Sequence, residues 1–503
     1  MSLMTPILRR VVAAWIIAAA ALAPAVARDA DAPLPRWRGF NLLEKFIFTG
    51  KAEPYKEEDF RMIAELGFNF VRLPLDYRGY IAGKDWEAFD EASLHQIDEA
   101  IAWGGRHGIH VCINLHRAPG YTVAQPPEAK VLWTDPETQR VAARHWGMFA
   151  RRYRDIPSSR LSFNLFNEPA NVTAAAYEPV MLKMVVAIRK EDPDRLIFSD
   201  GLDWGKQPMA ACRAPGLAMM TRGYEPFGLT HYKASWANGG RFPLPRWPDG
   251  LPTTGTLLSP SRPDKHHPLV IDGPIPDGSV LKIRVAHVTT RAVLVVDCGG
   301  KELLRKQFTT GPAGTGPWKS STLLPEWNVY RCEYGTEEAL ALPAGTRSVR
   351  IRVADGDWLQ VDRIAVVTTD GEKYEMSLTE SWGGKPETLH FHPAAGTIPA
   401  RLATTIDGTA LLRKNLQPWL DFRAGGGRFM VGEWGSYNRT PHPVVLSWAE
   451  DNLRLWKETG VGWAMWNFRG PFGVLDSERT DVGYEDWHGH KLDRKLVELL
   501  RKY

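Results

Sequence analysis

The stretch Leu-Ser-Phe-Asn-Leu-Phe-Asn-Glu-Pro at residues 161–169 is a short apolar run that stops at Glu168 and a proline. A second such run, Arg-Phe-Met-Val-Gly-Glu-Trp-Gly at residues 428–435, stops at Glu433. Both have the length and the bounding turn residues of a buried parallel strand. The carboxyl ends of parallel strands meet at one face of an α/β fold, where ligands bind. The two glutamates are therefore candidates for one site, although either alone could equally serve in a cap or an ion pair.

The sequence around these two runs predicts a (β/α)8 barrel. Apolar runs alternate with segments whose apolar residues recur at helical spacing, which is typical of a parallel sheet with crossover helices. We expect strands at residues 39–41, 68–73, 110–115, 161–168, 196–199, 217–221, 429–431 and 462–466. We expect helices at residues 56–66, 93–107, 139–153, 173–190, 407–422, 447–459 and 491–501.

The alternation changes character between about residues 255 and 395. Segments such as 280–285, 292–297 and 348–353 place apolar and polar residues in turn, with glycine-containing turns between them. Such a pattern is typical of an antiparallel sandwich. We therefore expect residues 28–254 and 396–503 to form the barrel, interrupted between its sixth and seventh strands by an all-β sandwich at residues 255–395. Its tryptophans could be sugar-binding platforms or ordinary core residues.

The first 27 residues have the pattern of a secretory signal peptide. Arg9 and Arg10 precede the apolar run 11–22, and Ala-Val-Ala follows at residues 25–27. A membrane anchor is the alternative, but the run is short for a spanning helix and no second one follows. We expect the mature chain to begin near Arg28, to be secreted or periplasmic, and to have no stable membrane insertion.

Composition narrows the classes of partner. The chain has 62 Lys and Arg against 58 Asp and Glu, a balance that argues against binding to nucleic acid or to an anionic membrane surface. Four cysteines show no Cys-x-x-Cys spacing, so we predict no metal site and no cofactor. Cys298 and Cys332 could pair in an oxidising compartment, and the sequence leaves that open.

The predicted strand ends carry a set of polar and aromatic residues: Arg72, His116, Asn167, Glu168, Tyr224, Glu433 and Trp466. Two carboxyl groups on different strands are the minimum that cleavage of a glycosidic bond requires, one to donate a proton and one to attack the anomeric carbon. Arg72 and Tyr224 could hydrogen-bond the attacking carboxylate. Asn167 could bind a sugar hydroxyl, and Trp466 could lie under the sugar ring.

Five motifs on these strand ends match a known family. They are Val-Arg-Leu-Pro at 71–74, His116 with Gly120, Asn-Glu-Pro at 167–169, Gly-Glu-Trp-Gly at 432–435 and Trp-Ala-Met-Trp at 463–466. Over nearly all of its barrel the chain resembles glycoside hydrolase family 5, the cellulase-type (β/α)8 enzymes. The resemblance implies that Glu168 is the acid/base and Glu433 the nucleophile. It also implies that Arg72, His116, Asn167, Tyr224 and Trp466 surround the reacting sugar.

The sixth strand departs from the family pattern of His-x-Tyr. The counterpart we favour is Arg-Gly-Tyr at 222–224, because the preceding residues 217–220 are strand-like. The alternative, Thr-His-Tyr at 230–232, restores the histidine but leaves Lys233 where the tyrosine of the pattern belongs. On the favoured alignment His231 is a loop residue near the pocket, either structural or ligand-binding. The arginine puts the common endoglucanase specificity in question.

The acid-rich segment at residues 476–488 is either a solvated turn with caps or a wall that closes one end of the cleft. Together these observations predict a secreted, retaining β-glycoside hydrolase acting on a β-glucan or a related polysaccharide. An exo-acting β-glucosidase and a mannan- or glycoconjugate-directed enzyme are the alternatives. A non-catalytic carbohydrate-binding protein is the contrasting class, which would have no need of a matched acid and nucleophile.

Overall fold

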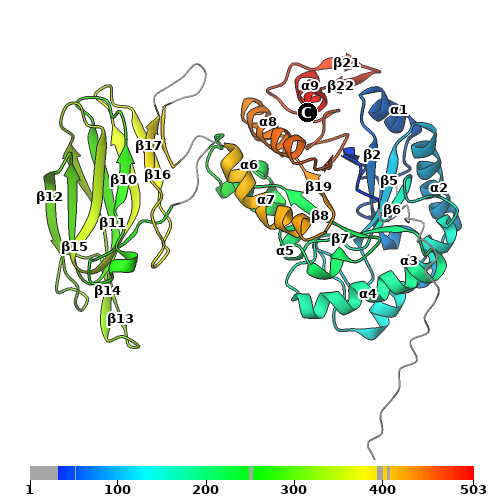
Figure 1. The fold of residues 1–503 in the computed structure, drawn as a ribbon, viewed down its shortest axis with the longest axis horizontal. Coiled ribbons are helices and arrows are strands. Elements are labelled where there is room, and N and C mark those ends of the chain that lie inside the picture. Colours follow the sequence, from blue (N-terminus) through cyan, green and yellow to red (C-terminus); the bar gives the residue numbers. More distant parts are fainter. Residues whose placement is uncertain (1–31, 51–52, 249–252, 393–399, 405–407) are drawn as a thin grey trace, which may run out of the picture.

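The computed structural model describes residues 32–50, 53–248, 253–392, 400–404 and 408–503 (Figure 1). The predicted signal peptide at residues 1–27 lies outside these ranges. Within them, no helix combines the length and the apolar composition needed to cross a membrane.

Eight parallel strands close into a barrel in the order β1-β2-β5-β6-β7-β8-β19-β20, which confirms the predicted (β/α)8 class (Figure 1). Their bounds are β1 (Arg38–Asn41), β2 (Phe70–Asp76), β5 (His110–Arg117), β6 (Leu161–Asn164), β7 (Leu196–Asp200), β8 (Leu217–Gly223), β19 (Phe429–Trp434) and β20 (Trp463–Met465). Every residue of β2, β5, β6, β7 and β19 is buried, as expected of strands covered on both faces.

The helices that cover the barrel begin where the sequence supplies caps. Asp90, Asp135, Thr173 and Asp493 each accept a hydrogen bond from a backbone N–H in the first turn of the helix that follows. The helices are α1 (Glu57–Glu65), α2 (Glu91–Arg106), α3 (Pro136–Tyr153), α4 (Ala174–Glu191), α5 (Leu202–Gly205), α6 (Phe227–Thr230), α7 (Gly408–Ala424), α8 (His442–Glu458) and α9 (Arg494–Lys502). Short 3-10 turns are η2 (Tyr77–Gly79), η3 (Ala210–Arg213), η4 (Ser235–Ala237), η5 (Gly239–Arg241) and η6 (Pro263–Lys265). Two small hairpins pair β3 (Ile81–Ala82) with β4 (Asp85–Phe89) and β21 (Glu485–Trp487) with β22 (His490–Leu492).

The barrel interior changes from apolar to polar along four of its strands, β2, β5, β7 and β8. A separate apolar cluster, to which strands from all around the barrel contribute, fills one end of it. The inward positions then run from an apolar residue to a polar one two places further on: Phe70 to Arg72, Cys112 to Asn114, Phe198 to Asp200 and Met220 to Arg222. Because side chains of a strand alternate between faces, these polar residues point into the same interior, nearer the carboxyl ends of the strands.

The inserted domain lies between β8 and β19, the sixth and seventh barrel strands, as predicted, and it has its own apolar core. It contains β9 (Thr256–Leu258), β10 (Leu269–Asp272), β11 (Val280–Cys298), β12 (Lys301–Phe308), β13 (Ser320–Leu324), β14 (Val329–Ala341), β15 (Ser348–Val367), β16 (Lys373–Ser377), β17 (Leu389–His392) and β18 (Arg401–Ala403). The long strands β11 and β15 pair antiparallel over most of their length, with shifts of register near Thr289 that let them bend. β18 continues the sheet beyond residue 395. In Figure 1 the domain stands beside the barrel as a separate body.

All four cysteines are free, so Cys298 and Cys332 do not form the bond that the sequence left open. The thiol of Cys298 lies 3.4 Å from the hydroxyl of Thr346. That of Cys332 lies 3.4 Å from the hydroxyl of Ser321. Two exposed tryptophans of the insert are Trp327 and Trp382, and the amine of Lys265 lies 4.2 Å from the ring centre of Trp382.

Candidate functional site

One guanidinium links the two glutamates at the carboxyl end of the barrel. Arg222, near the end of β8, donates from Nε to Oε1 of Glu168 at 2.9 Å. Its Nη2 lies 3.1 Å from Oε1 of Glu433. The Arg222 side chain is 3% exposed, and those of Glu168 and Glu433 are 16% and 4% exposed. The structure therefore brings both predicted carboxyl groups into one largely buried site, around the arginine that departs from the family pattern.

A bulge in β19 orients Glu433. The pairing of β19 with β8 shifts register between Val431 and Glu433, at Gly432. A side chain at Gly432 would meet the sulfur of Met220 at 2.7 Å, so the bulge requires glycine. Oε1 of Glu433 accepts from Nη1 of Arg72 at 2.6 Å, and Oε2 accepts from the hydroxyl of Tyr224 at 3.3 Å.

Glu168 lies four residues beyond the end of β6, in a turn that holds its backbone at φ +49°. A non-glycine residue in this left-handed region is strained, and such strain is concentrated at functional sites. The turn is fixed at both ends of the residue. The backbone N–H of Glu168 donates to Asp200 at 2.9 Å, and its carbonyl accepts from the hydroxyl of Tyr121 at 2.6 Å.

Arg72 is completely buried and uses all of its nitrogens. Nε donates to Asn164 at 2.9 Å, Nη1 to Asn41 at 3.0 Å and Nη2 to Asn167 at 3.0 Å, in addition to the bond with Glu433. The same oxygen of Asn167 accepts from Nη2 of Arg222 at 2.8 Å. With its carbonyl oxygen held by two guanidiniums, the Asn167 side chain turns its NH2 group away from them, where it can donate to a ligand.

Asp200 at the end of β7 is a site residue that sequence reasoning missed. It forms an ion pair with Arg222, accepts from the amide of Asn164 at 2.8 Å and holds the backbone of Glu168. The signal was present, because Asp200 follows the inward-facing Phe198 by two residues.

The charges of the cluster explain the state of Glu168. Two guanidiniums, Arg72 and Arg222, face three carboxyl groups, Glu168, Glu433 and Asp200. Burial raises the pKa of Glu168 to about 7, with Glu433 and Asp200 adding to the rise and Arg222 opposing it. Protonation of Glu168 makes the cluster neutral, and a pKa of about 7 keeps a large share of this carboxyl group protonated near neutral pH.

An aromatic group lies on the side of the site formed by β1, β5 and β20. His116 and Trp466 stack with ring centres 5.4 Å apart, and Phe46, which sequence reasoning also missed, packs edge-on against both at 5.7 and 5.8 Å. Burial, together with the cations Arg72 and Arg222, holds the pKa of His116 well below its usual value. His116 is therefore neutral at pH 7.

The structure places His231 behind Tyr224. Its ring packs edge-on against Tyr224 at 5.2 Å and stacks on Phe227 at 4.0 Å. Its Nδ1 lies 2.9 Å from the hydroxyl of Thr230. Burial lowers the pKa of His231 to about 4. These contacts support Tyr224, while Tyr224 itself reaches Glu433.

The acid-rich segment after β20 is held by its own contacts. Asp476 accepts from the backbone of Lys491 at 2.9 Å, and Asp481 accepts from that of His442 at 2.7 Å. Glu485 pairs with Arg494 at 2.7 Å. These three carboxylates therefore act as caps and ion-pair partners.

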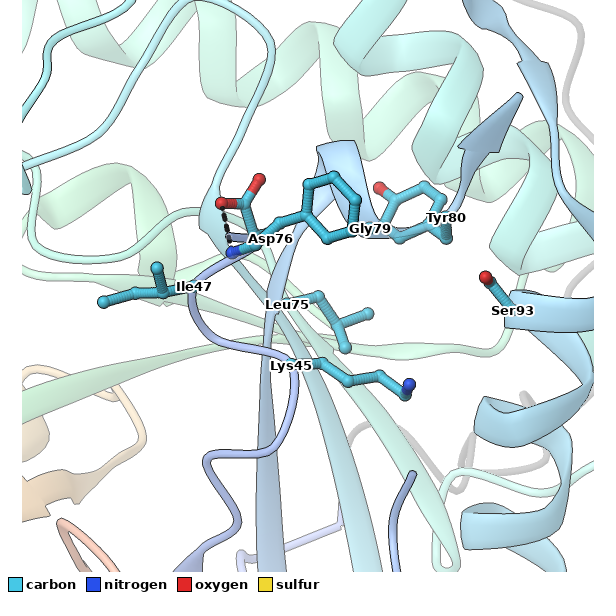
Figure 2. A pocket seen from close by; sticks show the side chains of 8 residues that line it. Lys45, Ile47, Leu75, Asp76, Gly79, Tyr80 and Ser93 are labelled. Atoms are coloured by element: carbon cyan, nitrogen blue, oxygen red, sulfur yellow. Dashed lines mark hydrogen bonds between the residues drawn. The ribbon is translucent and has the colours of Figure 1, made fainter. Parts of the chain in front are cut away.

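A small pocket lies beside the end of β2, away from the two glutamates (Figure 2). It is lined by Lys45, Ile47, Phe48, Leu75, Asp76, Gly79, Tyr80 and Ser93. Figure 2 shows Asp76 accepting from the backbone N–H of Phe48, at 3.0 Å. The amine of Lys45 donates to Gln96 at 2.5 Å. Since the polar groups of Asp76 and Lys45 are engaged in these bonds, we assign this pocket no chemistry.

Comparison with known proteins finds relatives among glycoside hydrolases. Residues 28–223 match the family described as cellulase (glycosyl hydrolase family 5). Endoglucanase C of Acetivibrio thermocellus is 29% identical over 185 residues, which are 36% of this chain and 53% of that protein. A probable glucan 1,3-beta-glucosidase A of Aspergillus fumigatus is 29% identical over 152 residues, 29% of this chain and 36% of that protein. A crystal structure described as a glycoside hydrolase is 25% identical, covers 93% of this chain and 99% of its own, and superposes with a TM-score of 0.59. The matches thus span about half the length, or less, of these curated relatives.

Proposed function

We propose that this chain, whose barrel matches glycosyl hydrolase family 5 over residues 28–223, is a retaining β-glycoside hydrolase acting on a β-glucan or a related polysaccharide. The observation that carries the proposal is the pair of carboxyl groups on one guanidinium. Burial raises the pKa of Glu168 to about 7, so that this group can donate a proton near neutral pH, and Glu433 lies beside Arg72 and Tyr224. Acid and nucleophile are the two parts that the double-displacement reaction requires.

In the first step, a carboxylate oxygen of Glu433 attacks the anomeric carbon and forms an ester. The bond from that carbon to the leaving oxygen breaks, and Glu168 gives its proton to this oxygen. Arg72 and Tyr224 orient the attacking group, since they hold one oxygen each. The NH2 group of Asn167 is free to bind a sugar hydroxyl.

In the second step, water attacks the anomeric carbon, Glu168 takes a proton from it, and the ester bond breaks to restore Glu433. The electrostatic interaction between Glu433 and Glu168 favours this change of Glu168 from acid to base. The charge of Glu433 raises the pKa of Glu168, and that charge is absent in the ester. The pKa of Glu168 therefore falls in the intermediate, where it must act as a base.

Glucans are the substrate class that the relatives suggest, because the two curated proteins named above are an endoglucanase and a probable glucan glucosidase. An exo-acting or mannan-directed specificity is the second candidate, supported by Arg222 in place of the family histidine. From the pattern of residues 1–27 we also infer that the protein is secreted or periplasmic.

Anomeric analysis tests the proposal. We expect ¹H NMR of the first products from a β-linked oligosaccharide to show the β-anomer, because two inversions restore the configuration. Initial α-anomers would contradict retention. A folded protein that cleaved none of a panel of β-glucans, β-mannans and aryl β-glycosides would contradict the activity itself.

Substitution of Arg222 should change the pH dependence. The cation lowers the pKa of Glu168, so Arg222→Met should raise that pKa and move the high-pH limb of kcat/KM upward by about 1 unit or more. The activity at the optimum should also fall by about 100-fold, because both carboxyl groups lose an orienting donor. Arg222→Lys keeps the charge and should keep the limb near its original pH. A limb that stayed in place in a folded Arg222→Met protein would show that Arg222 does not control the proton on Glu168.

A further inference from the structure

Trp236 is an exposed aromatic residue on the catalytic side of the barrel. It lies in η4, in the segment that follows β8, and its side chain is 63% exposed. Two other rings hold it. The ring centre of Trp236 lies 4.8 Å from that of Tyr437, edge-on, and 6.3 Å from that of Phe472. Tyr437 and Phe472 also contact each other at 5.8 Å. The indole is therefore supported by two rings while much of its surface is open to solvent.

The same rings connect Trp236 to the nucleophile. Phe472 packs edge-on against Tyr224 at 6.3 Å, and the hydroxyl of Tyr224 is 3.3 Å from Glu433. The segment that carries Tyr437 is fastened to the segment after β8, since the backbone N–H of Tyr437 donates to Thr230 at 2.8 Å. Trp236 is thus two ring contacts from the tyrosine that touches the reacting carboxylate.

The group formed by Trp236, Tyr437 and Phe472 lies at the same end of the barrel as a second aromatic group. Phe46, His116 and Trp466 come from the ends of β1, β5 and β20, which lie around β2 in the closed order. Trp236 follows β8, Tyr437 follows β19 and Phe472 follows β20, three strands that are consecutive in the closed order. Glu433, which Tyr224 contacts, is on β19, between β8 and β20.

We propose that Trp236, supported by Tyr437 and Phe472, binds a sugar ring of an extended β-linked glycan, beyond the bond that is cleaved. The proposal rests on the function proposed above. Aromatic faces bind the apolar faces of pyranose rings through their C–H groups. Phe472 separates Trp236 from the tyrosine beside the nucleophile, so only a glycan that extends past the cleaved unit reaches Trp236, and this contact selects for longer oligosaccharides.

The dependence of kcat/KM on oligosaccharide length tests whether Trp236 binds a sugar ring. We would measure kcat/KM for an aryl β-glycoside and for β-gluco-oligosaccharides of two to six units, or manno-oligosaccharides if those are preferred. Trp236→Ala should lower kcat/KM on the longest oligosaccharides by about tenfold, because one ring contact is lost, and leave the aryl glycoside unchanged. Trp236→Phe should restore most of the loss. Val186→Ala, at a site on α4 that is 68% exposed, should change nothing.

Three outcomes would contradict the proposal that Trp236 binds a sugar ring. One is an unchanged chain-length profile in Trp236→Ala. Another is an equal loss on the aryl glycoside and the long oligosaccharides, which would indicate a structural role. A third is a wild-type dimer that Trp236→Ala converts to a monomer, which would make the ring a contact between copies. A wild-type protein that cleaves no glycan would instead contradict the proposed function, so the two failures are distinguishable.

Discussion

Glu433→Gln is expected to lower kcat by about 10⁴-fold or more on every substrate, because an amide cannot form the ester on which both steps depend. No leaving group compensates for this loss, since the attack itself fails. The amide has nearly the size of the carboxylate and can still accept from Arg72 or Tyr224, so the fold should persist. Steady-state rates on an aryl β-glycoside and on a β-glucan, with circular dichroism of both proteins, are the measurements.

A control for Glu433→Gln is Glu485→Gln, which removes a surface carboxylate that pairs with Arg494. This variant should keep wild-type rates, because exposed ion pairs contribute little. If a folded Glu433→Gln protein kept more than a tenth of wild-type activity, Glu433 could not be the nucleophile.

Glu168→Gln is expected to show losses that depend on the leaving group. Removal of a general acid costs about 10²- to 10⁴-fold where the leaving oxygen needs a proton, as in a β-glucan. A dinitrophenyl glycoside leaves without one, so the ester with Glu433 should still form. Because the base for the second step is also missing, that ester should accumulate and be visible by mass spectrometry of the intact protein.

Azide provides the matching control. It needs no general base, so it should attack the accumulated ester in Glu168→Gln, restore turnover of the dinitrophenyl substrate and yield a β-glycosyl azide. It should not rescue Glu433→Gln in this way, because no ester forms there. Equal losses on good and poor leaving groups would assign the acid/base role to another residue.

Much of the site follows from local sequence pattern. Two pairs of residues stand two positions apart in buried strands: Phe70 with Arg72, and Phe198 with Asp200. Because side chains alternate between the two faces of a strand, the members of each pair both point into the barrel interior. Helix starts also carry a local signal, since Asp135 before Pro136 and Thr173 before Ala174 are ordinary caps, although the predicted start at residue 139 is three residues late. After about residue 255, apolar and polar residues alternate, and this change predicted where the barrel is interrupted. The alternation can be read locally because it depends only on which face of a strand is buried.

Other features depend on contacts between distant segments. Gly432 permits a bulge, but its direction is set by Met220 on the neighbouring strand. Glu168 is held at positive φ by Asp200 and Tyr121, which lie 32 and 47 residues away in the chain. Phe46 joins His116 and Trp466 only because β1, β5 and β20 meet at one mouth.

The sequence by itself determined the class of barrel, the place of the insert and the two carboxyl groups, because these depend on periodicity and residue type within short segments. Only the tertiary structure decided that Arg222 would join Glu168, Glu433 and Asp200, and that the pKa of Glu168 would rise to about 7. Electrostatic energies depend on burial and on distances across the barrel, and neither is a property of any one strand. The same is true of Trp236, which meets Tyr437 and Phe472 because β8, β19 and β20 are consecutive in the closed barrel.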